Sequence, residues 1–170
     1  MWLMSSRPSD RRSVTPPSPR RSRLTRPIRG TFARAGVLTY ARAAATATTL
    51  ADGTVLVAGG YAAGGEVARA ERYDPLANAF APTGPLCVPR LAHTALLLTS
   101  GRALILGGLT HQRTDPPCPC EEYDPASGNF YVVAPAVAVR PAARATTLND
   151  GRVLVTGGWS GFSAVDEARI

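Results

Sequence analysis

The sequence predicts an all-β fold, and three observations predict it. A unit of 29 residues occurs three times without a gap, and its copies start 48 and then 50 residues apart. Within the repeat, short apolar runs alternate with Gly-containing turns, and no helical pattern is present. An internal period of about fifty residues is typical of β-propellers and other repeat arrays. The three copies occupy residues 32–60, 80–108 and 130–158.

Each copy carries the same few residues in the same register. A Phe opens it, an Arg follows ten positions later, and a Gly-Gly pair closes it. Repetition favours structural roles: glycine allows backbone angles that a Cβ would block, aromatic rings fill the space between sheets, and we expect the arginines to brace neighbouring sheets. The residues assigned to this structural repeat are Phe32, Phe80, Phe130, Arg42, Arg90, Arg140, Gly59, Gly60, Gly107, Gly108, Gly157, Gly158, Tyr73 and Tyr123.

The first two strands of each repeat are predicted to form a hairpin. A run rich in Thr and Leu precedes a two-residue turn that ends in Gly, a residue that tolerates the positive φ of tight hairpins. The run after the turn is continuously apolar, as expected of a strand covered on both faces. The first strands are expected at 44–50, 93–98 and 144–148, the turns at 52–53, 100–101 and 150–151, and the second strands at 55–58, 103–106 and 153–156.

A third and a fourth strand complete each repeat. The third leads into Tyr-Asp-Pro at 73–75 and at 123–125, where Pro stops the ladder because it has no N–H to donate. The fourth begins at Phe80 or Phe130, and by register at Phe32. Four short antiparallel strands make one propeller blade.

The repeat count predicts an incomplete ring. The 140 residues after position 30 amount to about three repeats, whereas closed propellers have about 4–8 blades. We expect two complete blades with partial blades on either side, which form an open arc or a fragment of a ring of six or seven blades. The remaining blades, or a second copy of the chain placed head to tail, would complete it.

The blade pattern resembles the kelch repeat. That family has a strand that ends in Gly-Gly, then a variable loop, then a Tyr and a further aromatic residue, and here Tyr73 precedes Phe80 by seven residues, as Tyr123 precedes Phe130. The family usually has Trp at the last position, where this chain has Phe. Its Arg-x-x-His start occurs once, at residues 90–93. The resemblance covers roughly residues 32–170 and implies a kelch-type β-propeller.

The charge is concentrated in the first thirty residues. Eight of the 19 cationic residues, all Arg, lie there beside the single acid Asp10. Residues 1–30 are also rich in Ser and Pro, so we predict a disordered tail before a partial propeller at residues 31–170. The remaining 11 Arg balance 11 acids, so a basic surface for nucleic acid is not predicted.

Candidate binding residues lie in the loops after Gly-Gly, because these loops do not repeat. They are Tyr61, His111, Arg113, Asp115 and Trp159. The second loop also contains Cys118 and Cys120, but Cys-Pro-Cys does not match the usual spacing of structural zinc ligands. We therefore predict no metal site and no cofactor. A disulfide between two of the three Cys residues stays an alternative.

The sequence favours a non-catalytic module that binds a protein or a glycan through its loops, as part of a longer propeller. The alternative is a fragment of a galactose-oxidase-like copper oxidase or of another propeller enzyme. Resemblance to that oxidase implies two His and Tyr ligands with a cross-linked Cys, whereas this chain has only His93 and His111. We predict that His93 is a hydrogen-bonded structural residue. No run is apolar enough to be a signal-peptide core or to span a membrane, and no compartment is predicted.

Overall fold

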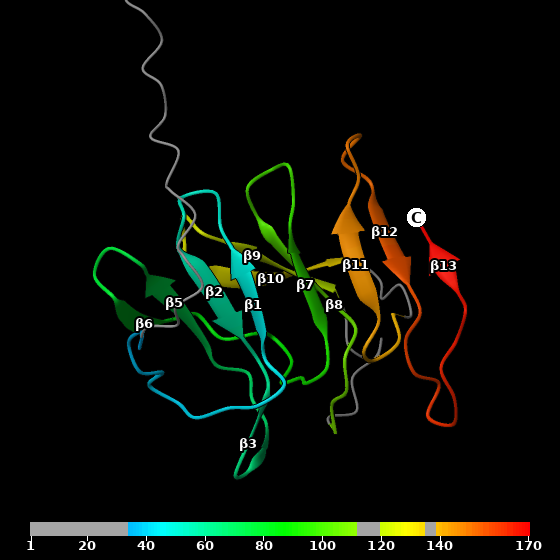
Figure 1. Cartoon of the computed structure of the whole chain (residues 1–170), viewed down its shortest axis with the longest axis horizontal. Coiled ribbons are helices and arrows are strands. Elements are labelled where there is room, and N and C mark those ends of the chain that lie inside the picture. The colour runs from blue at the N-terminus through cyan, green and yellow to red at the C-terminus, as the bar shows by residue number, and fades with distance from the viewer. Residues whose placement is uncertain (1–33, 112–119, 135–138) are drawn as a thin grey trace, which may run out of the picture. The chain divides into compact units, whose positions relative to one another are not determined.

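The computed structural model describes residues 34–111, 120–134 and 139–170, and these contain strands and turns but no helix (Figure 1). The predicted all-β fold is confirmed. Phe32, the segment 1–30 predicted to be disordered, and the loop residues Arg113, Asp115 and Cys118 lie outside the described residues.

The described strands form two four-stranded antiparallel sheets, one three-stranded sheet and one small hairpin, and sheet strands adjacent in sequence are adjacent in space. The first sheet contains β1 (Thr46–Thr49), β2 (Val55–Ala58), β5 (Ala70–Asp74) and β6 (Ala79–Thr83). The second sheet contains β7 (Thr94–Leu97), β8 (Ala103–Leu106), β9 (Cys120–Asp124) and β10 (Asn129–Ala134). The third sheet contains β11 (Arg144–Thr147), β12 (Val153–Thr156) and β13 (Ala168–Arg169). The hairpin consists of β3 (Tyr61–Ala62) and β4 (Gly65–Glu66).

The turn between the first two strands is longer than predicted. In the first sheet, Leu50 N–H donates to the carbonyl of Thr54 (2.8 Å), and Gly53 N–H donates back to Leu50 (3.0 Å). Three residues therefore lie between the paired positions. Only the last of them, Gly53, has positive φ (84°), as in the hairpin that ends in a glycine bulge. The same two bonds recur at Leu98–Arg102 and Leu148–Arg152.

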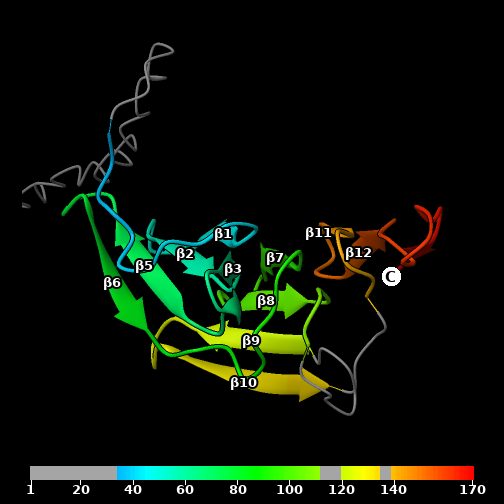
Figure 2. The ribbon, with the colours of Figure 1, turned by 90° about the horizontal axis from the view of Figure 1, so that it is seen from below.

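The first strands of the three sheets lie next to one another. β7 contacts β1 on one side and β11 on the other, while β6 and β10 lie farthest from these strands (Figure 2). Backbone hydrogen bonds join the repeats here: Ala142 N–H donates to Ala92 (2.8 Å), and Ala92 N–H donates to Ala44 (3.4 Å). These alanines hold the same place in the three repeats.

The main hydrophobic core lies between the first and second sheets. Tyr123 is fully buried there and Phe130 is 7% exposed, and their ring centroids are 4.9 Å apart. The prediction that these aromatic residues pack one sheet on the next is confirmed for this pair. Tyr73 and Phe80 make the same ring contact, also at 4.9 Å, but they are only partly buried on the other face of the first sheet.

Two of the three repeated arginines, Arg42 and Arg90, brace the sheet that follows them. Arg90 is fully buried and its Nη2 donates to Glu121 Oε1 of β9 at 2.6 Å, while its Nη1 donates to the Gly107 carbonyl at 3.0 Å. Arg42 makes the same bonds to Glu71 and Gly59. These guanidinium contacts stay within one repeat, so the expectation that they brace neighbouring sheets is corrected. The backbone carbonyl of Arg90 contacts the preceding repeat, where it accepts a hydrogen bond from Gly60 N–H (2.8 Å).

The Gly-Gly pair is required by close backbone approach. Gly59 and Gly60 both have positive φ (63° and 106°). A Cβ on Gly59 would lie 2.7 Å from the Arg90 carbonyl oxygen, and one on Gly60 would lie 2.6 Å from that of Ala43. The chain can therefore cross from β2 into the following loop only without side chains at these positions.

Candidate ligand-binding face

The loops that follow Gly-Gly lie at one end of the sheets. Figure 1 shows the β3–β4 hairpin, the segment after β8 and the loop after β12 at this end, and the β1–β2, β7–β8 and β11–β12 turns at the opposite end. The repeated part of the structure thus presents its unrepeated segments on a common side. We name this side the loop face.

One residue occupies the same place in each of the three loops. Tyr61, Leu109 and Trp159 directly follow Gly-Gly, and their N–H groups donate to the carbonyls of residues 43, 91 and 141 at 2.7, 2.8 and 2.9 Å. In the first two repeats the bond is reciprocated, because residues 43 and 91 donate back. Position 141 is Pro, which has no N–H to donate.

These three side chains are exposed although they are large and apolar. The exposed fractions are 50% for Tyr61, 49% for Leu109 and 49% for Trp159. Their backbone is fixed by the bridges, and Tyr and Trp lose little rotamer freedom on contact with a ligand because they have few side-chain torsions. A ligand could therefore cover them at low entropic cost.

The first and second loops are joined by a polar contact. Glu66, at the end of the β3–β4 hairpin, contacts Nδ1 of His111 through its Oε1. The Glu66 side chain is only 9% exposed, whereas that of His111 is 89% exposed. The imidazole therefore lies on the surface, where a ligand can reach it, while the carboxylate that it contacts is nearly buried.

The third loop closes on itself around Trp159. Ser160 N–H donates to the Ser163 carbonyl (3.0 Å), and Val165 N–H donates to the Gly158 carbonyl (3.1 Å). At the tip, Phe162 is 96% exposed. The loop thus presents two aromatic side chains to solvent.

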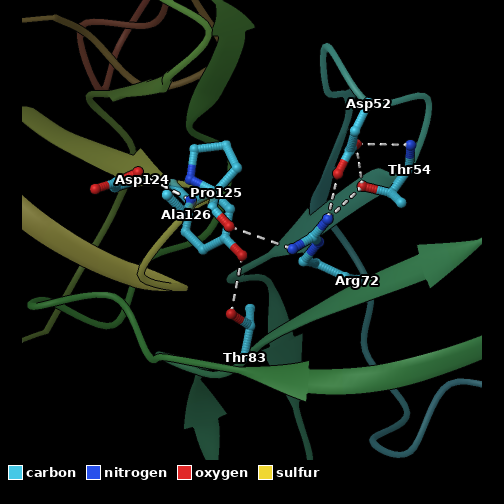
Figure 3. A network of polar contacts seen from close by, with 8 residues as sticks. Asp52, Thr54, Arg72, Thr83, Asp124, Pro125 and Ala126 are labelled. Carbon is cyan, nitrogen blue, oxygen red and sulfur yellow. Dashed lines mark hydrogen bonds and ion pairs between the residues drawn. The ribbon is translucent and has the colours of Figure 1, made fainter.

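A polar network that includes residues of the β1–β2 turn joins the first two sheets (Figure 3). Arg72 of β5 donates to Asp52 (2.5 Å) and to the Pro125 carbonyl (3.4 Å), and Thr83 donates to the carbonyl of Gly128 (2.9 Å). The hydrogen bond from the Thr54 hydroxyl, aided by Arg72, lowers the pKa of Asp52. Each of these groups already has a partner inside the protein, so this network serves the fold.

His93 joins the first and second sheets and is not available to a ligand. It is 5% exposed, and its Nε2 lies 2.8 Å from the hydroxyl of Thr46. Burial, together with the charge of Arg90, lowers the pKa of His93 to about 4. The prediction of a hydrogen-bonded structural His is confirmed. The buried Nδ1 of His93 has no hydrogen-bond partner. If the imidazole is neutral and its Nε2–H donates to Thr46, Nδ1 carries no proton, so only an acceptor lone pair lacks a partner.

The cysteines and histidines do not converge in the described part of the chain. Cys87 and Cys120 form no disulfide with each other, and burial, with the nearby Glu121, raises the pKa of the Cys87 thiol. In residues 34–111, 120–134 and 139–170, no three His, Cys, Asp or Glu side chains are grouped so that they could hold a metal ion. These residues also include no helix that could span a membrane.

No protein-family model matches this chain, and no curated protein matches it.

The structure places three of the five sequence-predicted binding residues, Tyr61, His111 and Trp159, on the loop face. The other two lie outside the described residues. Sequence reasoning missed Leu109, although its register directly after Gly-Gly is the same as that of Tyr61 and Trp159. It also missed Glu66, whose contact with His111 spans 45 residues and has no local signal.

Proposed function

We propose that the chain is a non-catalytic kelch-type β-propeller module that binds a protein or glycan ligand through its loop face. One observation carries the binding proposal: Tyr61, Leu109 and Trp159 recur at one position in three loops, each about half exposed and each bridged through its backbone. Exposed aromatic side chains held on a rigid framework are the anchors that interfaces prefer.

The sheet arrangement supports the propeller part of the proposal. In each sheet the strands follow one another outward from the first strand, and the first strands of successive sheets are neighbours. This order and these neighbours are the ones that the radial repetition of propeller blades would give. Closed rings have about 4–8 blades, so further blades, from additional sequence or from another chain, would complete the ring.

A protein ligand agrees better with the loop face than a glycan does. Aromatic rings can stack on sugars, but the middle position of the row is Leu109, which offers no ring face. The exposed side chains of Tyr61 and Leu109, together with the polar contact between His111 and Glu66, match the mixture of apolar anchors and polar partners at protein interfaces.

The test uses two probes, a displayed random-peptide library and an immobilised glycan array. We expect the chain to select peptides, and the double variant Tyr61→Ala/Trp159→Ala to bind a selected peptide at least about tenfold more weakly, since interface aromatic residues contribute 2 kcal/mol or more. Tyr131→Ala is the matched control, because Tyr131 is 45% exposed on β10 and lies away from the loops. It should bind within twofold of the parent chain.

Two results would decide against this proposal. Equal peptide binding by the parent chain and the double variant would remove the loop face as the site. If the chain bound only glycans and the double variant lost this binding, the loop face would still be the binding site, but its ligand would be a carbohydrate and not a protein. Thermal unfolding of all three chains checks that the substitutions leave the fold intact.

A further inference from the structure

Three glutamate side chains in the described residues are at least nine-tenths buried, and two of them pair with an arginine. Glu71 pairs with Arg42 and Glu121 with Arg90, both at 2.6 Å, and all four side chains are at most 1% exposed. Each of these carboxylates also accepts N–H bonds from two backbone groups. A carboxylate withdrawn from water needs such partners to offset its lost hydration. These two glutamates find them inside the protein.

Glu66 is the third of these side chains, and in the described part of the chain it has no arginine partner. Its side chain is 9% exposed, and its Oε1 contacts Nδ1 of His111, whose side chain is 89% exposed. Its other oxygen, Oε2, makes no hydrogen bond to a described residue. The nearest cation along the chain, Arg69, lies over the ring of Tyr40, 3.8 Å from the centroid. Since an arginine is always charged and a histidine is not, Glu66 lacks the permanent cation that the other two glutamates have.

An exposed aromatic side chain stands directly opposite Glu66. Tyr61 of β3 and Glu66 of β4 are partners in the β3–β4 ladder, and the side chains of such a pair lie on the same face, with Cβ atoms about 5 Å apart. Tyr61 is 50% exposed. A cation is attracted both to the face of an aromatic ring and to a carboxylate. A guanidinium suits this pair best, because it is flat enough to stack on a ring while its N–H groups donate to carboxylate oxygens.

The third loop has the aromatic residue without the acid. Trp159 is bridged to Ala164 across its loop, as Tyr61 is paired with Glu66 across the first loop. Because Ala164 carries no charge, Trp159 is suited to an apolar group. The combination of ring and carboxylate thus distinguishes the first loop from the third.

We propose that Tyr61 and Glu66 form a subsite for an arginine side chain of the protein ligand. This inference rests on the proposed function, because it assigns the chemistry of one residue of the ligand that the loop face binds. The guanidinium stacks on the Tyr61 ring and donates to Oε2 of Glu66, while His111 keeps its contact with Oε1. Trp159 contacts an apolar residue of the same ligand.

The first experiment uses a small probe and needs no identified ligand. N-acetyl-arginine amide is titrated into the chain and followed by NMR, and the citrulline compound, which has a similar shape without the charge, is the neutral control. We expect saturable shifts of the Tyr61 and His111 ring resonances with the arginine compound, and a response at least about tenfold weaker with the citrulline compound, because a charged donor is lost. Equal responses to the two compounds, or no response to either, would overturn the proposal.

A pair of matched variants locates the probe. Glu66→Gln keeps the size of the side chain and removes its charge, so it should abolish the response to the arginine compound. Asp166→Asn also removes one negative charge, from an exposed residue just after the third loop, and should leave the affinity within about twofold, because exposed charges at a distance are screened. A response that survives Glu66→Gln, or is lost equally in both variants, would overturn the assignment to Glu66. Thermal unfolding checks that both variants are folded.

The second experiment separates this inference from the proposed function. Peptides that bind the parent chain and not Tyr61→Ala/Trp159→Ala are synthesised again with each Arg replaced by Gln. We expect this replacement to weaken binding to the parent chain at least about tenfold and binding to the Glu66→Gln chain less than about twofold, because the partner is already absent there.

The remaining results each have one meaning. Equal losses on the parent and Glu66→Gln chains, or selected peptides without Arg, would overturn the arginine subsite while the loop face remained the binding site. Peptides that bind Tyr61→Ala/Trp159→Ala as well as the parent chain would refute the proposed function, and with it the ligand to which the arginine is assigned.

Discussion

The second and third repeats use the same arginine in opposite ways. Arg90 is fully buried against Glu121, with both side chains 0% exposed and 2.6 Å between them. Arg140 holds the same place in the third repeat, but it meets Glu167 at 3.4 Å with side chains that are 42% and 36% exposed. An identical residue in identical register thus makes a buried ion pair in one sheet and a solvated one in the next.

The difference comes from the acid and not from the arginine. Glu121 of β9 stands opposite Ile105, and in the third sheet the residue opposite the equivalent Val155 is Arg169. Glu121 also accepts N–H bonds from Cys87 (2.6 Å) and Val88 (3.2 Å), and so its charge can be buried without losing its hydrogen bonds. In the third repeat Arg140 and Arg169 share Glu167 at the surface. Sequence repetition therefore marks a shared backbone geometry, and it does not fix the energetic contribution of each copy.

The largest expected effect is the loss of Glu121. Glu121→Gln leaves the Arg90 guanidinium buried without a counter-charge, and breaking one side of a buried pair costs about 3–5 kcal/mol. This is a large part of the usual stability of a domain. Urea unfolding measures it, with Glu167→Gln as the matched control in the third repeat, whose midpoint should not change measurably. Similar midpoint shifts in the two variants would contradict the distinction between the repeats.

The sequence predicted the features that the repeats share, and it did not predict the contacts that differ between them. The second strands were predicted at the residues where β2, β8 and β12 are found, because apolar runs beside turns are local signals. The burial of Glu71 and Glu121 was not predicted, because each depends on an arginine 29 or 31 residues away and on the register that joins them. The β3–β4 hairpin was also missed, since strands of two residues are too short for an alternating pattern.

The candidate site was predictable only in part. Tyr61 and Trp159 were found because they lie outside the repeated unit, and the structure shows that Leu109 belongs with them. The contact between His111 and Glu66 required coordinates, because it joins loops of two repeats.

The second effect in size is the pH dependence that His93 gives to the second repeat alone, since the other repeats have Ala45 and Ala143 there. Its pKa is about 4 in the folded protein and about 6.5 unfolded. The unfolded state therefore binds the extra proton between these values, and stability present above pH 6.5 falls as pH decreases toward 4. The loss is about 3 kcal/mol. Urea midpoints between pH 7.5 and 4.5 measure it. His93→Gln should flatten the curve in this window, and an unchanged slope would show that another group is responsible.

A third prediction concerns a feature that all three repeats share. Ala44, Ala92 and Ala142 have φ of 53°, 51° and 60°, a conformation that is unfavourable for residues with a Cβ. Ala44 is exposed, so Ala44→Gly removes strain without loss of burial and should stabilise the protein by about 0.5–1 kcal/mol. Ala47 is also exposed but lies in β1, where a substitution by Gly should destabilise the protein. Thermal unfolding of both variants measures the difference, and two changes of the same sign would contradict the assigned strain.

The smallest expected effect tests whether the third repeat can be made like the second. Arg169→Glu places a carboxylate at the position of Glu121 and within the sheet that Arg140 precedes. The new pair is partly exposed, so the gain should be about 0.5 kcal/mol or less. Arg169→Gln is the matched control, because it removes the same positive charge without a carboxylate. A stability gain that appears with Glu, is absent with Gln and disappears when Arg140→Ala is added would show that the new carboxylate pairs with Arg140. The third repeat would then lack only an acid at this position. An equal gain with Gln would show that removing the crowding of two arginines around Glu167 is the whole effect.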